Sequence, residues 1–392
     1  MRPLDGITVL ALEHAVSAPF ATRHLADLGA RVIKVERPEG GDFARGYDET
    51  VRGLSSYFVW INRSKESLTL NLKHPRAKEI IARLLGRADV FVQNLAPGAT
   101  GRLGLQWEEL LARHPRLIVC DISGYGDSGP YRDRKAYDLL IQSEAGFLSV
   151  SGTADTPCKA GISIADIAAG TYAYSGILGA LYQRERTGKG MRIEVSMLEA
   201  LGEWMGFPLY YAHYGGAAPS RTGASHATIY PYGPFRAGDG KSVMLGVQNE
   251  REWAEFCDVV LGCPEMARDP RFDSNSRRVA NREALVRGID KVFSGLTAEE
   301  IVRRLDAAQI ANARMNDMEA VWNHPQLAAR GRWRKVSTPA GTVSALLPPA
   351  TLSTCEARLG GVPALGEHTD AVLAELGFSL EEIAALRAES AV

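Results

Sequence analysis

Short apolar runs alternate with amphipathic stretches along the first 200 residues. The runs are rich in Val, Ile and Leu and predict buried strands, at 7–12, 30–36, 68–72, 88–95 and 116–124. Pro19 and Pro75 open two of the helical stretches between them, and Gly29 stands where the first helix should end. Strands that alternate with helices predict a parallel α/β sheet with right-handed crossovers.

The second half of the chain has a different pattern. A helix rich in Ala and Gly is expected over 167–183, directly after Asp166, followed by a strand within 188–197 and a helix over 198–205. Residues 214–226 are rich in Gly, Ala and Ser and predict a linker. Beyond it we expect a hairpin with Asp239-Gly240 as its turn, helices to about 330, β-structure within 331–358 and two short C-terminal helices.

Composition narrows the class of protein. A chain of 392 residues predicts two domains, and a net charge of −1 gives no reason to expect a nucleic-acid or acidic-membrane partner. No apolar run reaches the roughly 18 residues of a membrane span, and no signal peptide is evident. Five scattered cysteines favour the reducing cytoplasm, and without a CxxC or HxxxH pair no metal site is expected.

The strand–helix–strand start of the chain is also typical of dinucleotide-binding enzymes. A Rossmann dinucleotide site needs G-x-G-x-x-G after the first strand, where the pyrophosphate approaches the backbone. The chain reads "EHAVSAPF" there, without a glycine. We therefore expect no bound nicotinamide or flavin, although side chains at the strand ends could still hold a nucleotide.

Ten stretches in order along residues 3–377 resemble the class III CoA-transferase family (CaiB/BaiF type), which includes formyl-CoA:oxalate and carnitine CoA-transferases. They are "PLDGITVL", "LGARVIKVERPEGGDFAR", "NRSKESLTLNLKHP", "VFVQNLAPGATGRLGL", "GYGDSGPY", "KAYDLLIQSEAG", "ADIAAG", "LYQRERTGKGMRIEVSMLEA", "PYGPFRAGDG" and "LGEHTDAVLAELG".

The resemblance implies a fold and an assembly. It implies a large Rossmann-like parallel-sheet domain and a smaller α+β domain, in a ring-shaped chain that forms an interlocked homodimer. On this pattern the large domain takes 1–200, a linker 201–225, the small domain 226–330, and the return linker with the C-terminal helices of the large domain 331–392.

Asp166 stands where the family has its catalytic aspartate. The resemblance implies that its carboxylate attacks an acyl-CoA thioester to give an aspartyl anhydride and then an aspartyl-CoA thioester, with CoA as substrate and no permanently bound cofactor or metal. Backbone N–H groups at the start of the helix are the expected oxyanion donors. The alternative is that Asp166 only caps that helix.

The "KAYD" stretch would line the same site. The resemblance implies that Tyr137 donates a hydrogen bond near the thioester, that Asp138 orients groups around the nucleophile, and that Lys135 contacts a CoA phosphate. The alternatives are a helix cap for Asp138 and a solvated surface lysine for Lys135.

The remaining CoA contacts follow from the resemblance position by position. They lie after successive strands, and the basic ones suit the three phosphates of CoA. They are His14, Ala15, Val16, Arg37, Leu70, Leu72, Lys73, Asn94, Leu95 and Arg102. For each basic residue, a solvated charge is the alternative.

The acyl groups are less constrained. Val16 replaces a glutamine of formyl-CoA transferase and its four-glycine run is missing, which argues against formyl-CoA and oxalate. The stretch 161–188 resembles members that use succinyl-CoA and C4–C5 dicarboxylates such as itaconate, mesaconate or citramalate. Arg45, Arg221 and His226 could bind the distal carboxylate, or could be surface and linker charges.

Two other functions stay open. An α-methylacyl-CoA racemase of the same family abstracts a proton with a His and Asp pair, but Tyr137 stands where its histidine would be. A non-catalytic CoA-binding protein would have no use for a carboxylate at position 166.

Overall fold

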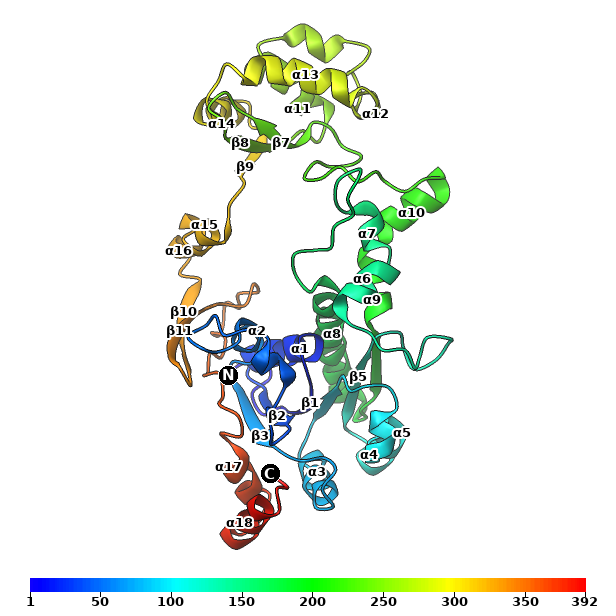
Figure 1. Ribbon diagram of the computed structural model, residues 1–392, viewed down its shortest axis with the longest axis vertical. Helices are drawn as coiled ribbons and strands as arrows, with labels where there is room; N and C mark the ends of the chain where they lie inside the picture. The colour runs from blue at the N-terminus through cyan, green and yellow to red at the C-terminus, as the bar shows by residue number, and fades with distance from the viewer. The chain divides into compact units, whose positions relative to one another are not determined.

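The computed structural model describes residues 1–392, and the chain divides into two compact units. The first unit contains 1–145, 160–205 and 326–392, and the second contains 146–159 and 206–325. Each unit thus collects segments that are distant in the sequence, which Figure 1 shows as mixed colours within one unit. The domain boundaries expected from the sequence stay a prediction.

A six-stranded parallel sheet forms the centre of the first unit, in the order β3-β2-β1-β4-β5-β6. The strands are β1 Thr8–Leu12, β2 Arg31–Glu36, β3 Lys65–Thr69, β4 Val90–Gln93, β5 Ile118–Ser123 and β6 Arg192–Ser196. The prediction of a parallel α/β sheet is confirmed. The strand order reverses between β1 and β4, and the crevice outside the carboxyl ends of such strands is where this architecture binds ligands.

Helices cover the sheet and connect its strands. They are α1 Ser17–Asp27, η1 Phe43–Gly46, α2 Ser56–Ile61, α3 Ala77–Leu85, α4 Ala99–Leu103, α5 Trp107–Arg113, α6 Asp138–Glu144, α8 Ile164–Thr187, α9 Met197–Trp204, α17 Thr369–Glu375 and α18 Leu380–Ala388. The hairpin of β10 Trp333–Thr338 and β11 Gly341–Leu346 also belongs to this unit. Helix α16 Pro325–Ala329 lies where the chain returns to the unit at residue 326.

Helices α1 and α8 pack against one another, next to the strands (Figure 1). Side chains of α3, α5, α17 and α18 join a core with alternate residues of the sheet, among them Leu10, Leu12 and Phe91. The close α1–α8 contact needs a glycine, because a Cβ on Gly170 would lie 2.6 Å from the Ser17 carbonyl oxygen.

The second unit is built on three antiparallel strands, β7 Tyr232–Arg236, β8 Ser242–Gly246 and β9 Ala311–Arg314. The expected hairpin around Asp239-Gly240 is confirmed by β7 and β8. Its helices are α7 Phe147–Val150, α10 Gly206–Gly215, α11 Glu250–Glu255, the π-turn η2 Phe256–Val260, η3 Pro264–Arg268, α12 Asn275–Ala280, α13 Arg282–Phe293, α14 Ala298–Ala307 and α15 Met318–Trp322.

A core of aromatic and aliphatic side chains, including Trp253, Phe256 and Phe293, holds the second unit together. Helix α10 lies inside the range 201–225, for which the sequence predicts a linker. Across the whole chain, no helix combines the length and apolar character that a membrane span requires.

Candidate active site

Asp166 lies in the first turn of α8. The helix begins at Ile164, three residues before the expected 167, and Ser163 occupies the N-cap position without a side-chain cap. The interpretation of Asp166 as the N-cap is therefore wrong. The cap comes from another helix, because Oδ1 of Asp138 accepts from the backbone N–H of Ala165 at 2.8 Å and of Asp166 at 3.3 Å.

Asp138 is held in this capping position by Gln142. Asp138 is the first residue of α6, and Nε2 of Gln142 one turn later donates to its Oδ2 at 2.7 Å. Gln142 is fully buried, and its Oε1 accepts from the Ala160 backbone N–H at 2.9 Å. Asp138 thus caps α8 and not its own helix, whose N-cap position is Tyr137.

The carboxyl group of Asp166 is half-buried beside a second carboxyl group. Burial raises its pKa to about 7, with a further contribution from the charge of Asp138, while a hydrogen bond from the Ser17 side chain acts in the opposite direction. A pKa near neutrality leaves a large carboxylate population at pH 7 that is poorly solvated. Such a group is a better nucleophile than a solvated aspartate.

The turn after β1 has an unusual backbone that is braced on both sides. Ala15 adopts a positive φ of 58°, and its N–H donates to Asp42 Oδ1 at 3.1 Å. Asn94, after β4, accepts from the His14 N–H and donates to the His14 carbonyl, both at 2.9 Å. The two neighbouring strand ends at the reversal of strand order are therefore tied together.

A buried cluster of ion pairs holds Asp42, which accepts from the Ala15 N–H in this turn. Lys34 lies 2.8 Å from Asp42 and 3.3 Å from Glu13, and Lys65 lies 2.6 Å from Glu13. Burial alone would raise the pKa values of Glu13 and Asp42, but the lysine charges outweigh it and lower both. These carboxylates therefore stay ionised and paired, and their role is structural.

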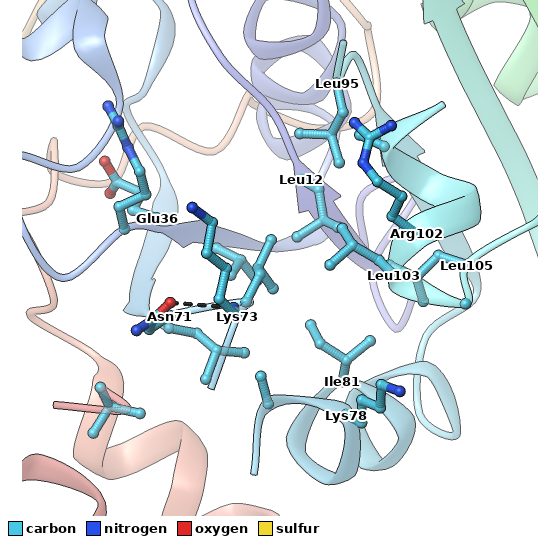
Figure 2. Close-up of a pocket in the computed structure, with 18 of the residues that line it drawn as sticks. Leu12, Glu36, Asn71, Lys73, Lys78, Ile81, Leu95, Arg102, Leu103 and Leu105 are labelled. Carbon is cyan, nitrogen blue, oxygen red and sulfur yellow. Dashed lines mark hydrogen bonds between the residues drawn. The ribbon is translucent and has the colours of Figure 1, made fainter. Parts of the chain in front are cut away.

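A pocket of about 1310 Å³ lies in the first unit beside β1, β2 and β4 (Figure 2). Its volume exceeds the roughly 300–1,000 Å³ of an ordinary ligand site, so it suits a ligand as large as the CoA nucleotide. Seven of the expected CoA contacts line it, namely His14, Arg37, Leu70, Leu72, Lys73, Leu95 and Arg102.

Three cations around the pocket have neither an acidic partner nor a hydrogen bond from their side chain. The side chains of Lys73, Lys78 and Arg102 make no ion pair, and Figure 2 shows them on three different segments around it. By contrast, Arg387 is paired with Asp370, and Arg37 donates to the Gly41 carbonyl. Unpaired cations beside an apolar floor match a ligand that combines phosphates with a base.

The other expected site residues are distributed as follows. Ala15 and Asn94 shape the turn described above and Val16 is buried next to it. Tyr137 and Lys135 are exposed, on the segment that leads into α6.

The three candidates for the distal carboxylate have partners of their own. Arg45 makes two 2.8 Å contacts with the Glu36 carboxylate, so binding a substrate there requires replacing that pair. Arg221 donates to the carbonyls of Thr153 and Ala154, and His226 stacks on Tyr232, all within the second unit.

Three residues near these groups were not singled out from the sequence: Ser17, Gln142 and Lys78. Ser17 and Gln142 act through contacts with residues that are distant along the chain, which no local pattern reveals. Lys78 could have been suspected, because it lies five residues after the expected contact Lys73, at the start of the helix that Pro75 predicts.

Comparison with known proteins defines the class. The chain matches CoA-transferase family III over residues 4–369, and it belongs to that family. It is a CoA-transferase of the CaiB/BaiF type, an enzyme that works on CoA thioesters.

Individual relatives differ in the acids they are named for. The acetyl-CoA:oxalate CoA-transferase of Acetobacter aceti is 38% identical over 84% of each chain. The succinyl-CoA:glutarate CoA-transferase of Mus musculus is 34% identical over 96% of this chain and 87% of the relative. Among solved structures, a CaiB/BaiF family protein from Brucella suis has a TM-score of 0.83 and 34% identity, covering 96% of this chain and 99% of that one.

Proposed function

We propose that this enzyme transfers CoA from succinyl-CoA to a C4–C5 dicarboxylate such as itaconate, mesaconate or citramalate. Support for the substrate class comes from the succinyl-CoA:glutarate relative, whose named acceptor is itself a five-carbon dicarboxylate. The acetyl-CoA:oxalate relative keeps oxalate in the set of acceptors to be assayed, against the expectation from Val16.

The observation that carries the mechanism is the carboxyl group of Asp166, held without a cation beside Asp138, in the unit that contains the pocket with free cations. The Asp166 carboxylate attacks the succinyl thioester and expels CoA thiolate. The product is an aspartyl–succinyl anhydride. The thiolate then attacks the aspartyl carbon, which frees succinate and gives aspartyl-CoA. The acceptor acid takes the place of succinate in the reverse sequence.

The pocket binds the nucleotide end of CoA in this proposal. Lys73, Arg102 and Lys135 bind phosphates, the leucines at 70, 72 and 95 pack against the adenine, and the His14–Val16 backbone faces the pantetheine arm. Tyr137 lies near the thioester. We also propose that the protein acts in the cytoplasm as an interlocked homodimer, for which sedimentation analysis of the molecular mass is the first measurement.

The decisive experiment is mass spectrometry after incubation with succinyl-CoA. We expect a CoA adduct on the peptide that contains Asp166, and its disappearance on addition of an acceptor acid. Asp166→Ala should lose the adduct and at least about a thousandfold of the transfer rate. Unchanged transfer by Asp166→Ala contradicts the nucleophile assignment, and α-deuterium uptake from deuterated water without an acceptor indicates a racemase.

A further inference from the structure

Lys78 stands at the N-terminal end of the face of α3 that lines the pocket. The lining residues of this helix, at 77, 78, 81, 82 and 85, are spaced as one helix face. Ala77, Ile81 and Leu85 of this face are buried, whereas Lys78 is exposed. The ammonium group of Lys78 therefore extends from an apolar wall on the side of the helix that faces the pocket.

Glu79, the acid next to Lys78, is already paired with other cations. Its carboxylate contacts Arg76 at 3.2 Å and Arg83 at 2.6 Å. Glu109, which lines the pocket from α5, is likewise paired within its own helix. Lys78 makes no ion pair and no side-chain hydrogen bond, so its charge is left for an anionic ligand.

Lys78 and Arg102 face the pocket from different sides. Figure 2 shows Leu12, Leu95 and Arg102 on one side and Lys78 with Ile81 on the other. Leu12 ends β1 and Leu95 follows β4, so the first side is continuous with the turn after β1. A ligand in the pocket therefore meets separate cations at its two ends.

The turn after β1 leads toward Asp166. Asn94 holds the His14 backbone in this turn and also donates to Ser17 Oγ at 3.2 Å. The Ser17 carbonyl faces α8 at Gly170, one helical turn after Asp166, where a Cβ would lie 2.6 Å from the carbonyl oxygen. The thioester of a bound acyl-CoA therefore belongs on this side of the pocket.

CoA carries phosphates at two positions of its ribose. The 5′-diphosphate continues into the pantetheine arm and the thioester, whereas the 3′-phosphate is a terminal monoester with close to two negative charges at neutral pH. With the thioester directed toward Asp166, the diphosphate lies on the side of Arg102. The 3′-phosphate is then directed toward the opposite side, where Lys78 extends from α3.

We propose that Lys78 binds the 3′-phosphate of CoA and so determines specificity for CoA thioesters over those of dephospho-CoA. This inference rests on the proposed function, in which the pocket binds the nucleotide end of CoA. It deepens that function by assigning the cation that recognises the one phosphate by which the two carriers differ. A contact of this kind adds affinity only for the ligand that carries the phosphate.

Calorimetric titration of the enzyme with CoA and with dephospho-CoA measures this preference. We expect wild type to bind CoA at least about tenfold more tightly than dephospho-CoA, as for one charged hydrogen bond. Lys78→Met should weaken CoA binding about tenfold and change dephospho-CoA binding less than about twofold. Lys78→Arg keeps the charge and should retain most of the preference.

Two further variants serve as controls. Arg102→Met should weaken the binding of both ligands by the same factor, because both carry the 5′-diphosphate. Lys291, on α13 of the second unit, is also an exposed helical lysine without an ion pair. Lys291→Met should therefore leave both affinities unchanged.

Transfer kinetics separate loss of binding from a structural defect. Lys78→Met should raise the KM for succinyl-CoA and leave kcat within about twofold of wild type, because the contact is the same in the ground state and the transition state. A defect in folding would instead lower kcat and weaken both ligands alike.

The outcomes distinguish the inference from the proposed function. If wild type binds CoA and dephospho-CoA equally, or if Lys78→Met weakens both ligands equally, the inference for Lys78 is wrong while the proposed function stands. If Lys78→Met and Arg102→Met both bind CoA as wild type does, the placement of CoA in this pocket fails and the inference fails with it. Transfer that persists in Asp166→Ala contradicts the proposed function, whatever the titrations show.

Discussion

The first unit contains two pairs of carboxyl groups that are partly or completely buried. One pair has cations beside it and the other has none. Glu13 and Asp42 are surrounded by Lys34 and Lys65, and their pKa values are lowered. Asp138 and Asp166 face one another with no cation, and the pKa of Asp166 is raised to about 7. Burial without a counter-ion is costly, and in enzymes it marks groups that react.

The difference shows how one sheet edge serves two purposes. Asp42 accepts from the Ala15 N–H and so fixes the backbone there, while Lys34 neutralises its charge. The unpaired acids keep a carboxylate whose charge is stabilised by few groups, so in the proposed mechanism its attack on a thioester relieves an unfavourable state. Substitutions in the lysine-paired acids should therefore lower stability, whereas substitution of Asp166 should raise stability and abolish transfer.

Breaking the paired cluster should have the largest effect on folding. Lys65→Met leaves the buried Glu13 carboxylate with the longer Lys34 contact as its only ion pair, beside the hydrogen bond from Thr22, and we expect a loss of about 3–5 kcal/mol in the free energy of unfolding. Urea denaturation at pH 7 measures it. The double variant Glu13→Gln/Lys65→Met should recover part of the loss, because no unpaired charge remains; no recovery would contradict the ion-pair explanation.

Removing the unpaired charge should stabilise the protein while abolishing transfer. The folded-state pKa of Asp166 lies above its unfolded value of 3.8, so the stability contributed by its proton is complete below about pH 4 and is lost as pH rises through about 7. Asp166→Asn should therefore be more stable than wild type at pH 8 by on the order of 2 kcal/mol, and should lose this advantage near pH 4.

Thermal unfolding at several pH values provides that measurement. Glu203→Gln, on the exposed surface of α9, is the matched control and should show little pH-dependent difference from wild type. A gain in stability of Asp166→Asn that is equal at pH 4 and pH 8 would argue against a strained carboxylate.

The smallest expected effect is that of removing the charge of Asp138, or of moving it one helical turn to position 142. Asp138→Asn removes the charge that raises the pKa of Asp166, so the acidic limb of kcat/KM should move down by up to about one pH unit. It also turns an amide toward Nε2 of Gln142, so two donors compete for one position.

Asp138→Asn/Gln142→Glu restores the matched donor and acceptor and returns the carboxylate at position 142. Its stability should rise above that of Asp138→Asn, while its acidic limb should lie between those of Asp138→Asn and wild type. Identical limbs in all three proteins would show that Asp138 acts only as a cap.

Local patterns predicted the elements of the sheet well. The apolar runs located β1, β2, β4 and β5, although β3 begins at Lys65 and ends at Thr69, earlier than the 68–72 run. That run alternates because Leu68 and Leu70 are buried, yet the chain has already left the sheet after Thr69. Family resemblance chose Asp166 from among many acids.

The arrangement around Asp166 was beyond sequence patterns. A local rule assigns an aspartate before a helix as the cap of that helix, whereas Asp138 caps α8 from 28 residues away and allows the helix to begin at Ile164. The close approach of α1 to α8 beside Asp166 depends on Gly170, where a Cβ would meet the Ser17 carbonyl. Such tertiary contacts override the propensities from which the local rule was derived.

Gln142 has a consequence for which changes of length this chain can accept. The chain leaves the first unit after Ala145 and returns at Ala160, where Gln142 fastens the returning strand of backbone. The segment 146–159 is not a free loop, because Arg221 donates to the Thr153 and Ala154 carbonyls and the Gly223 N–H donates to the Gly152 carbonyl. A change of length within 146–159 therefore has to keep these contacts, while the hydrogen bond from the Ala160 N–H to Gln142 fixes where the chain re-enters the first unit, four residues before α8 begins.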